Sequence, residues 1–376
     1  MIGLKTWTPD KEEIDWKEFR EREKRTNLPI LVDTADIANV LEVPAYALTF
    51  LITVKSSIIT SITIPKQNGK GVRKLFYPNT NAKEPEVAEG AELLKHIHKK
   101  LLYTLFQNFP ISDAAYGFVD GKDVISCAKE HINKTIVVAY DIKDFFPNTT
   151  YHKVRKLFHS YAPWTQKVAW TITELVTYYG HTPQGFSTSP MLSNLVMYEV
   201  DTALDRWAKE KGWCYTRYAD DLIFSKNGNP MTLLKEVEAE LHPLVTTQVK
   251  SKGYSIKDKK TKVMPKPGPQ TVLGIRVNHK LNLPRYKFDL LKAKVHNAAV
   301  KKRVPQEVIT DYVTGNRNAV ISHLRALSGE VVWAERLNPE KLKKVKQMVV
   351  ELMATKDSYR YEGPVEKKTD SAKKGA

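Results

Sequence analysis

Cysteines and long apolar runs are both scarce in this chain of 376 residues. Its two cysteines, Cys127 and Cys214, lie in apolar surroundings without metal-ligand spacing, so we expect neither a disulfide scaffold nor a zinc site. The longest apolar run, 45–54, is far shorter than the roughly 20 residues that span a bilayer, and residues 1–10 lack the apolar core of a signal peptide. We therefore expect a soluble, cytoplasmic protein without a membrane partner.

Acidic residues are also in short supply. The chain has 42 Asp and Glu against 59 Lys and Arg, which gives a net charge of +17. The basic excess is spread along the whole sequence and predicts attraction to a polyanion, which is either nucleic acid or an anionic membrane surface. The length and the hydrophobic content of 42% allow one large core or about two to three subdomains.

Two adjacent acids, Asp220 and Asp221, are flanked by aromatic and β-branched residues in segment 215–225. This pattern predicts a hairpin whose tight turn holds both acids. Side-by-side carboxylates repel each other unless a cation lies between them, and pairs of magnesium ions bound by such oxygens serve in-line phosphoryl transfer. An Asp-Asp pair is, however, more often an ordinary solvated turn, so other segments must decide between the two interpretations.

A third acid ends an apolar, β-branched run at 134–141, which predicts a buried strand with Asp141 at its C-terminal end. An unpaired acid buried there would be costly, so Asp141 requires a basic side chain or a metal ion shared with the other two acids. Small residues at 182–188 precede a helix predicted over 189–211. They either allow close approach of a substrate or form an ordinary loop.

Other segments predict further hairpins and helices. Runs at 57–65 and 72–78 predict a hairpin with Lys66 and Arg73 near its tip, which is either a solvated charged tip or a clamp for polyphosphate. Segment 271–278 predicts a hairpin arm, with its turn at 278–282, and 254–263 a basic strand. Residues 1–30 predict a charged, solvent-exposed helix that stops near Asn27 and Pro29. The other predicted helices cover residues 36–41, 88–109, 124–132, 152–179, 231–244, 290–302, 311–327 and 339–355.

In this order the motifs resemble those of a reverse transcriptase, and most closely the retron reverse transcriptases of bacteria. The matching segments are 64–73, 139–147, 182–185, 188–194, 217–222 and 272–274. The resemblance implies an α+β right-hand polymerase fold, with fingers, an antiparallel palm sheet with helices, and an α-helical thumb. The implied domains are an N-terminal helical region at 1–55, fingers at 56–135, palm at 136–285 with a fingers insertion near 150–190, an RNA-binding thumb at 286–356 and a basic, disordered tail at 357–376.

The resemblance also implies the site residues of an RNA-directed DNA polymerase, a nucleotidyltransferase. The implied catalytic residues and ligands of two Mg²⁺ ions are Asp141, Asp220 and Asp221, with the Ile142 carbonyl as a further metal ligand. The implied nucleotide-binding residues are Lys66, Arg73, Phe146, Gln184, Gly185 and Lys260. Phe146 would screen the sugar 2′ side, and Lys260 would donate a proton to the leaving pyrophosphate. The implied primer or RNA contacts are Val272, Leu273, Gly274, His131, Arg317, Arg325 and Lys343.

Two elements depart from the retron pattern. The Asn-Ala-x-x-His element reads Cys-Ala-Lys-Glu-His at 127–131, and the Val-Thr-Gly element reads Val-Leu-Gly at 272–274. His131 is either a core histidine or an RNA contact. A retron-type enzyme would use dNTPs to copy part of a structured noncoding RNA from an RNA 2′-hydroxyl. The product would be branched RNA-linked DNA (msDNA), which serves antiphage defence beside a separate effector protein. The alternatives are another bacterial defence or group II intron-like reverse transcriptase, and a non-catalytic RNA-binding scaffold.

Overall fold

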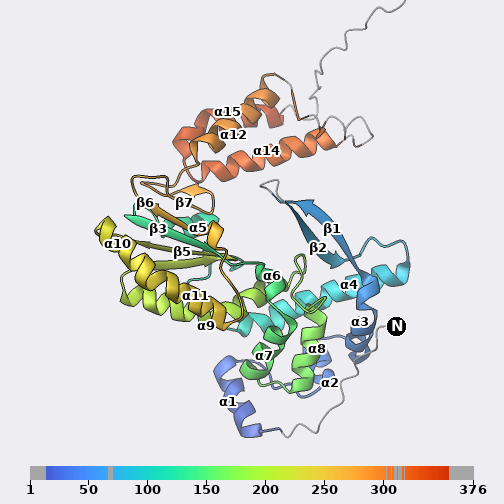
Figure 1. The fold of residues 1–376 in the computed structure, drawn as a ribbon. Coiled ribbons are helices and arrows are strands. Elements are labelled where there is room, and N and C mark those ends of the chain that lie inside the picture. Colours follow the sequence, from blue (N-terminus) through green and yellow to red (C-terminus); the bar gives the residue numbers. More distant parts are fainter. Residues whose placement is uncertain are drawn as a thin grey trace, which may run out of the picture. The chain divides into compact units, whose positions relative to one another are not determined.

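The computed structural model describes residues 14–66, 71–301, 303–305, 307–308, 311, 316 and 318–354. The chain forms two compact units, Met1–Pro265 and Lys266–Ala376, whose elements are labelled in Figure 1. The palm–thumb boundary expected at residue 286 falls inside the second unit, because a short hairpin at 271–276 belongs to the same unit as the C-terminal helices. Arg317 and the expected tail at 357–376 lie outside the described residues.

The first unit begins with three helices, α1 (Trp16–Thr26), α2 (Thr34–Leu41) and α3 (Ala45–Ile58). Helix α1 begins at Asp15, whose carboxylate accepts two backbone N–H groups of the first turn, and it ends at Asn27 with a positive φ. The sequence patterns did not predict α3. Its β-branched residues favour a strand locally, but one face is buried in the core and tertiary packing overrides that preference.

The predicted basic hairpin follows as β1 (Ile59–Pro65) and β2 (Val72–Pro78), which pair antiparallel. Pro65 pairs with Val72, and the backbone N–H of Lys66 donates to the carbonyl of Gly71 at 3.0 Å. Both Lys66 and Arg73 are exposed. The hairpin prediction is therefore confirmed, and its tip carries accessible positive charge.

A four-stranded antiparallel sheet has the order β4–β5–β3–β6. Its strands are β3 (Ile136–Asp141), β4 (Cys214–Tyr218), β5 (Asp221–Lys226) and β6 (Lys262–Pro265). β3 is almost fully buried between its two neighbours, as its continuous apolar run predicts. Helix α9 (Ser189–Glu210) packs against β4. Because β5 lies between β3 and β4, the sheet connects the buried acid of β3 to the β4–β5 hairpin.

Several predicted helices differ from the observed ones in extent. Segment 152–179 contains two helices, α7 (Tyr151–Tyr161) and α8 (Gln166–Val176), because Pro163 forces the preceding residue into an extended conformation. The other helical segments described in this unit are α4 (Pro85–Lys100), which continues as a π-turn (Leu101–Leu105) and a 3-10 turn (Phe106–Asn108), α5 (Val124–Lys129), α6 (Phe145–Asn148), α10 (Pro230–Glu236), a second π-turn (Val237–Leu241), α11 (His242–Ser251) and a second 3-10 turn (Asp258–Lys260).

The second unit contains the short strands β7 (Thr271–Val272) and β8 (Ile275–Arg276) and the helices α12 (Arg285–Ala299), α14 (Ala319–Glu335) and α15 (Pro339–Ala354). The three helices pack against one another, as expected for a helical thumb. The β7–β8 turn consists of Leu273 and Gly274, both with positive φ, whereas only the later turn at 278–282 had been predicted. That later turn is also present, since Arg276 and Asn282 exchange backbone hydrogen bonds.

No single helix of the described ranges has both the length and the hydropathy needed to cross a membrane. The helices α2 and α3 pass this test only when taken together, and they are bent by 103° at their junction.

Candidate active site

Asp220 and Asp221 lie at the tip of the predicted β4–β5 hairpin. Tyr218 pairs with Asp221, so the loop contains only Ala219 and Asp220, and Asp221 is the first residue of β5. Ala219 has a φ of 53°, the positive value that hairpin turns require at the first loop position. The hairpin is confirmed, with the correction that Asp221 belongs to a strand and not to the turn.

Strand β3 brings the third acid to the same place. Asp141 is the register partner of Asp221 in the neighbouring strand. One residue further, the backbone N–H of Ile142 donates to the carbonyl of Asp220 at 2.8 Å. Paired strands lie about 4.8 Å apart, so three acids that are distant along the chain are neighbours in space, as the sequence predicted. Their catalytic roles stay predictions at this point.

Two lysines bind the carboxylate of Asp141, which is only 8% exposed. Lys257 Nζ lies 3.0 Å from Oδ1, and Lys260 Nζ lies 2.5 Å from Oδ2. The backbone N–H of Lys257 also donates to the Asp141 carbonyl at 2.8 Å. The sequence analysis predicted that Asp141 needs a cation and singled out Lys260, but it did not identify Lys257.

The other two carboxylates are poorly compensated. Burial raises the pKa of Asp221 to about 7, and repulsion from Asp220 and Asp141 adds to the shift. Burial also raises the pKa of Asp220, again with a contribution from Asp141. Nearby lysines offset these shifts only in part, so a cation bound at the hairpin tip would favour the charged carboxylates.

We expect the metal-free protein to lose stability as the pH rises from about 4 to about 7. The folded-state pKa of Asp221 is about 7 against an ordinary value of 3.8. Across this window the folded state keeps a proton that the unfolded state has released, so the stabilisation is present at the acidic end and is lost as pH rises. Thermal unfolding in EDTA of the wild type and of Asp221→Asn measures this. The wild-type Tm should fall relative to that of the variant, and parallel curves would contradict the prediction.

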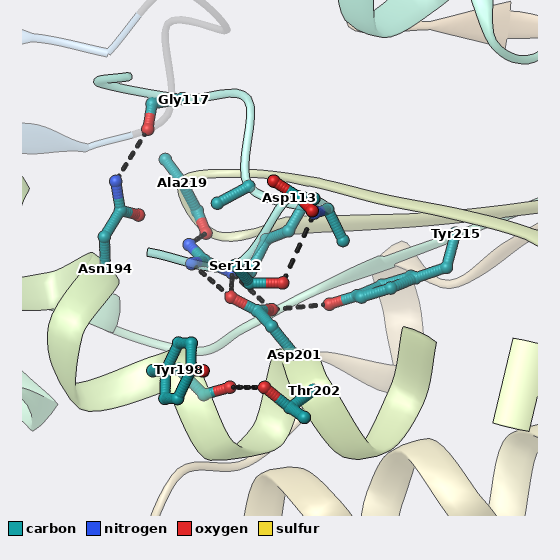
Figure 2. A network of polar contacts seen from close by, with 12 residues as sticks. Ser112, Asp113, Gly117, Asn194, Tyr198, Asp201, Thr202, Tyr215 and Ala219 are labelled. Atoms are coloured by element: carbon teal, nitrogen blue, oxygen red, sulfur yellow. Dashed lines mark hydrogen bonds and ion pairs between the residues drawn. The ribbon is translucent and has the colours of Figure 1, made fainter. Parts of the chain in front are cut away.

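A buried ion pair connects the hairpin turn to helix α9, and Figure 2 shows the Asp201 and Ala219 ends of this connection. Arg217 of β4 is 0% exposed, and its Nε and Nη2 donate to the Asp201 carboxylate of α9 at 2.8 and 2.6 Å. The Tyr215 hydroxyl donates to the same carboxylate at 2.8 Å. The remaining guanidinium nitrogen, Nη1, donates to the carbonyl of Ala219 at 3.1 Å. The ion pair thus ties the residue before Asp220 to helix α9.

A second contact from α9 reaches the loop around Gly117, which packs against the same turn. Asn194 Nδ2 donates to the carbonyl of Gly117 at 2.9 Å (Figure 2). A Cβ atom on Gly117 would lie only 2.6 Å from the backbone nitrogen of Ala219, so glycine is required for this loop to pack against the turn. Helix α9 therefore braces the Asp220 turn both directly, through the ion pair, and through the Gly117 loop.

Removing one partner of the buried pair should destabilise the protein strongly. Asp201→Asn would leave the Arg217 guanidinium without its compensating charge, and such changes cost about 3–5 kcal/mol. Urea unfolding should show a loss of this size, which the double variant Asp201→Leu with Arg217→Met recovers in large part because no charge stays buried. An Asp201→Asn variant as stable as the wild type would show that the pair does not hold this region together.

The predicted nucleotide-binding loop lies against strand β2. The carbonyl of Gln184 accepts the backbone N–H of Phe76 at 2.7 Å. Gly185 has a φ of 111°, and a Cβ atom there would lie 2.3 Å from the Phe76 carbonyl oxygen, so only glycine fits. Thr182 of the same loop donates to the carbonyl of Phe146 at 3.2 Å. The structure therefore connects three of the predicted nucleotide-binding residues, while Lys66 and Arg73 lie on the hairpin that contains β2.

His131 does not present its ring for an RNA contact. It is 0% exposed, and its Nδ1 and Nε2 each lie 2.8 Å from a hydroxyl oxygen, of Ser225 and Thr216 respectively. Burial lowers its pKa to about 3, so the ring is neutral. Of the two interpretations open from the sequence, the structure supports the core histidine, and the assignment of His131 to RNA binding is corrected.

The remaining predicted primer and RNA contacts belong to the second unit. Val272 is buried, and Leu273 and Gly274 form the β7–β8 turn. Arg325 on α14 and Lys343 on α15 are exposed. The Arg325 and Lys343 side chains are accessible to RNA, whereas the buried Val272 side chain is not. Their roles in binding stay predictions.

Comparison with known proteins gives the family. The profile described as reverse transcriptase (RNA-dependent DNA polymerase) matches residues 65–277, more than half of the chain, which therefore belongs to the reverse transcriptase family. Its curated relatives include bacterial retron enzymes. The retron Mx65 reverse transcriptase of Myxococcus xanthus is 30% identical over 76% of this chain, and the retron Ec86 reverse transcriptase of Escherichia coli is 26% identical over 73%.

The chain spans 62% of the Mx65 protein and 81% of the Ec86 protein. Among solved structures, apo telomerase from Candida tropicalis is similar with a TM-score of 0.44 and 9% identity, over 83% of this chain and 62% of that one. The family match and the antiparallel sheet with its helices confirm the expected right-hand polymerase fold, and the retron relatives confirm the expected resemblance.

Proposed function

We propose that this protein is a retron-type reverse transcriptase, an RNA-directed DNA polymerase that copies part of a structured noncoding RNA into DNA. The observation that carries the proposal is the convergence of Asp141, Asp220 and Asp221 through the β3–β5 register, in a chain of the reverse transcriptase family. The net charge of +17 supports a nucleic-acid partner. A non-catalytic RNA-binding scaffold would have no use for three acids placed where they repel one another.

The site would hold two Mg²⁺ ions on Asp141 and Asp220, with Asp221 and the Ile142 carbonyl as further ligands. Magnesium is usually bound by one or two protein carboxylates and completed by substrate phosphates, so the acids and an incoming dNTP together would supply its ligands. Bound ions would neutralise charge on the entering and leaving oxygens of phosphoryl transfer. Burial and mutual repulsion raise the pKa values of Asp220 and Asp221, and a bound cation would favour the charged form of both carboxylates.

The chain's own residues would then position the substrates. The exposed Lys66 and Arg73 would bind the triphosphate of the incoming dNTP, since ammonium and guanidinium groups both suit phosphate oxygens. Phe146 would exclude a 2′-hydroxyl from the sugar pocket, and Gln184 and Gly185 would form the wall of the nucleotide pocket. As the 3′-oxygen attacks the α-phosphate, pyrophosphate leaves.

Lys260 would protonate that leaving group. Its hydrogen bond to Asp141 is the main cause that raises its pKa, so the ammonium form is populated but would have to leave Asp141 before it donates the proton. The same ammonium group lies beside Asp141, where it would also stabilise the negative charge that develops on the leaving pyrophosphate.

The biological context in this proposal follows the retron relatives. DNA synthesis would begin at an RNA 2′-hydroxyl and give branched RNA-linked DNA (msDNA), in a cytoplasmic antiphage system that contains a separate effector protein. The exposed Arg325 and Lys343 would contact the RNA through its phosphates.

Loss of the two neighbouring acids should abolish DNA synthesis while RNA binding survives. Primer extension on an RNA template with dNTPs and Mg²⁺ should fall at least about a hundredfold for Asp220→Asn with Asp221→Asn, because several kcal/mol of charge stabilisation disappear. RNA affinity should stay within about twofold, since counterion release depends on the basic residues. The control is Glu21→Gln with Glu23→Gln, which removes two exposed acids from α1. Undiminished synthesis by the first variant would refute the polymerase assignment.

The retron assignment has a separate test. Nucleic acid that copurifies with the protein from its host should contain one structured RNA joined covalently to DNA, and enzymatic cleavage of a 2′–5′ branch should separate the two. DNA synthesis without any branched product would contradict the proposed priming and leave the polymerase activity in place.

A further inference from the structure

Three aromatic rings and a lysine form a cluster beside the Gln184 loop, which we call the aromatic platform. It consists of Lys74 and Phe76 on β2 and of Tyr178 and Tyr179 in the segment after α8. The ring centroids of Tyr178 and Tyr179 are 4.3 Å apart, and that of Phe76 lies 5.4 and 5.9 Å from them. Lys74 Nζ lies 5.1 Å from the Phe76 centroid. Lys74 and Phe76 are two residues apart on a strand and therefore share a face.

Tyr179 is held in an unfavourable backbone conformation. Tyr178 and His181 exchange backbone hydrogen bonds at 2.9 and 3.3 Å around a two-residue turn, in which Tyr179 and Gly180 have φ values of 49° and 78°. Asn or Gly suits the first position of such a turn, whereas a bulky residue there costs about 1–2 kcal/mol. The Tyr179 residue is 74% exposed, so burial of its ring returns little of that cost. The turn thus exposes an aromatic ring to solvent in a backbone conformation that lowers the stability of the folded state.

The platform adjoins the predicted nucleotide pocket. Phe76 donates its backbone N–H to the Gln184 carbonyl, and its own carbonyl lies where a side chain at Gly185 would begin. Arg73, predicted to bind the triphosphate, lies on β2 as well, with its side chain on the opposite face from Lys74 because neighbouring strand residues alternate. A ligand on the platform would therefore lie at the edge of the pocket and be separate from the triphosphate.

Aromatic faces combined with a basic side chain are the features that bind single-stranded nucleic acid. Unpaired bases stack on the rings, and the backbone phosphates lie near the cation. Building on the polymerase function proposed above, we propose that the aromatic platform binds the unpaired template strand just ahead of the nucleotide pocket. One base would stack on Tyr179, and the adjacent phosphate would lie near Lys74.

The experiment compares two nucleic acids and three variants. Fluorescence anisotropy, in EDTA, gives the affinity for a primer–template with a single-stranded 5′ template overhang and for the same duplex with a blunt end. Tyr179→Gly removes the ring and relaxes the turn, and Tyr179→Phe keeps the ring. The control is Tyr46→Ala on α3, which removes an equally exposed tyrosine, also 74% exposed, from another element.

Tyr179→Gly should weaken binding of the overhang substrate roughly 5- to 150-fold, the value of one stacked base, and change blunt-duplex affinity less than about twofold. Tyr179→Phe and Tyr46→Ala should bind both substrates like the wild type. Equal affinities of wild type and Tyr179→Gly for the overhang substrate, or equal losses on both substrates, would overturn the proposal. Because the assay requires no catalysis, its failure is distinguishable from failure of the polymerase assignment.

Two further readouts locate the contact. 2-Aminopurine at the first unpaired template positions should be quenched on binding to the wild type and to Tyr179→Phe, and should stay bright with Tyr179→Gly. Lys74→Gln should reduce the slope of log affinity against log salt by about 0.7 for the overhang substrate, the effect of one phosphate contact on a single strand. A salt slope of Lys74→Gln equal to that of the wild type, together with full 2-aminopurine quenching by Tyr179→Gly, would show that the template binds elsewhere. The Tm of Tyr179→Gly should equal or exceed that of the wild type, which excludes unfolding as the cause.

Discussion

The register between β3 and β5 is the constraint on which the rest of the site depends. It places Asp141 opposite Asp221 and joins Ile142 to the turn residue Asp220. The same register forces carboxylates together against their mutual repulsion, and burial makes the repulsion stronger. The buried Arg217–Asp201 pair holds the turn to α9 through the hydrogen bond of Arg217 to the Ala219 carbonyl. Packing thus imposes an arrangement that the local electrostatics oppose.

Cations are the natural complement of this arrangement, and the chain already supplies two of them. Lys257 and Lys260 bind both oxygens of Asp141 and compensate Asp220 and Asp221 only in part. An ammonium group is a compact point charge on a flexible stem, so it can release a carboxylate more readily than a rigid structural partner can. Two lysines that hold Asp141 when metal is absent would keep β3 in register and allow the carboxylate to be shared when a divalent ion binds.

Local patterns predicted much of this structure, and contacts between distant segments account for what they missed. Strand β3, the β4–β5 hairpin and helix α9 follow from periodicity and turn residues close in sequence. Lys257 was missed because its place beside Asp141 comes from a non-local pairing of backbones. An acid on the apolar face of a predicted helix requires a buried cation. Asp201 in the helix predicted over 189–211 and Arg217 in the next predicted strand form such a pair, which the sequence could have indicated.

Backbone conformations disfavoured for their residue types are concentrated around the site. Apart from C-terminal helix ends, where a left-handed residue is ordinary, the described non-glycine residues of the first unit with positive φ are Phe118, Asn133, Asp144, Tyr179 and Ala219. Phe118 contacts the ring of Phe146, Asp144 begins the turn that contains Phe146, and Ala219 precedes Asp220. Such strain persists only where surrounding packing over-determines it. Sequence propensity therefore fails at Phe118, Asp144 and Ala219, because packing against neighbouring segments sets the backbone there.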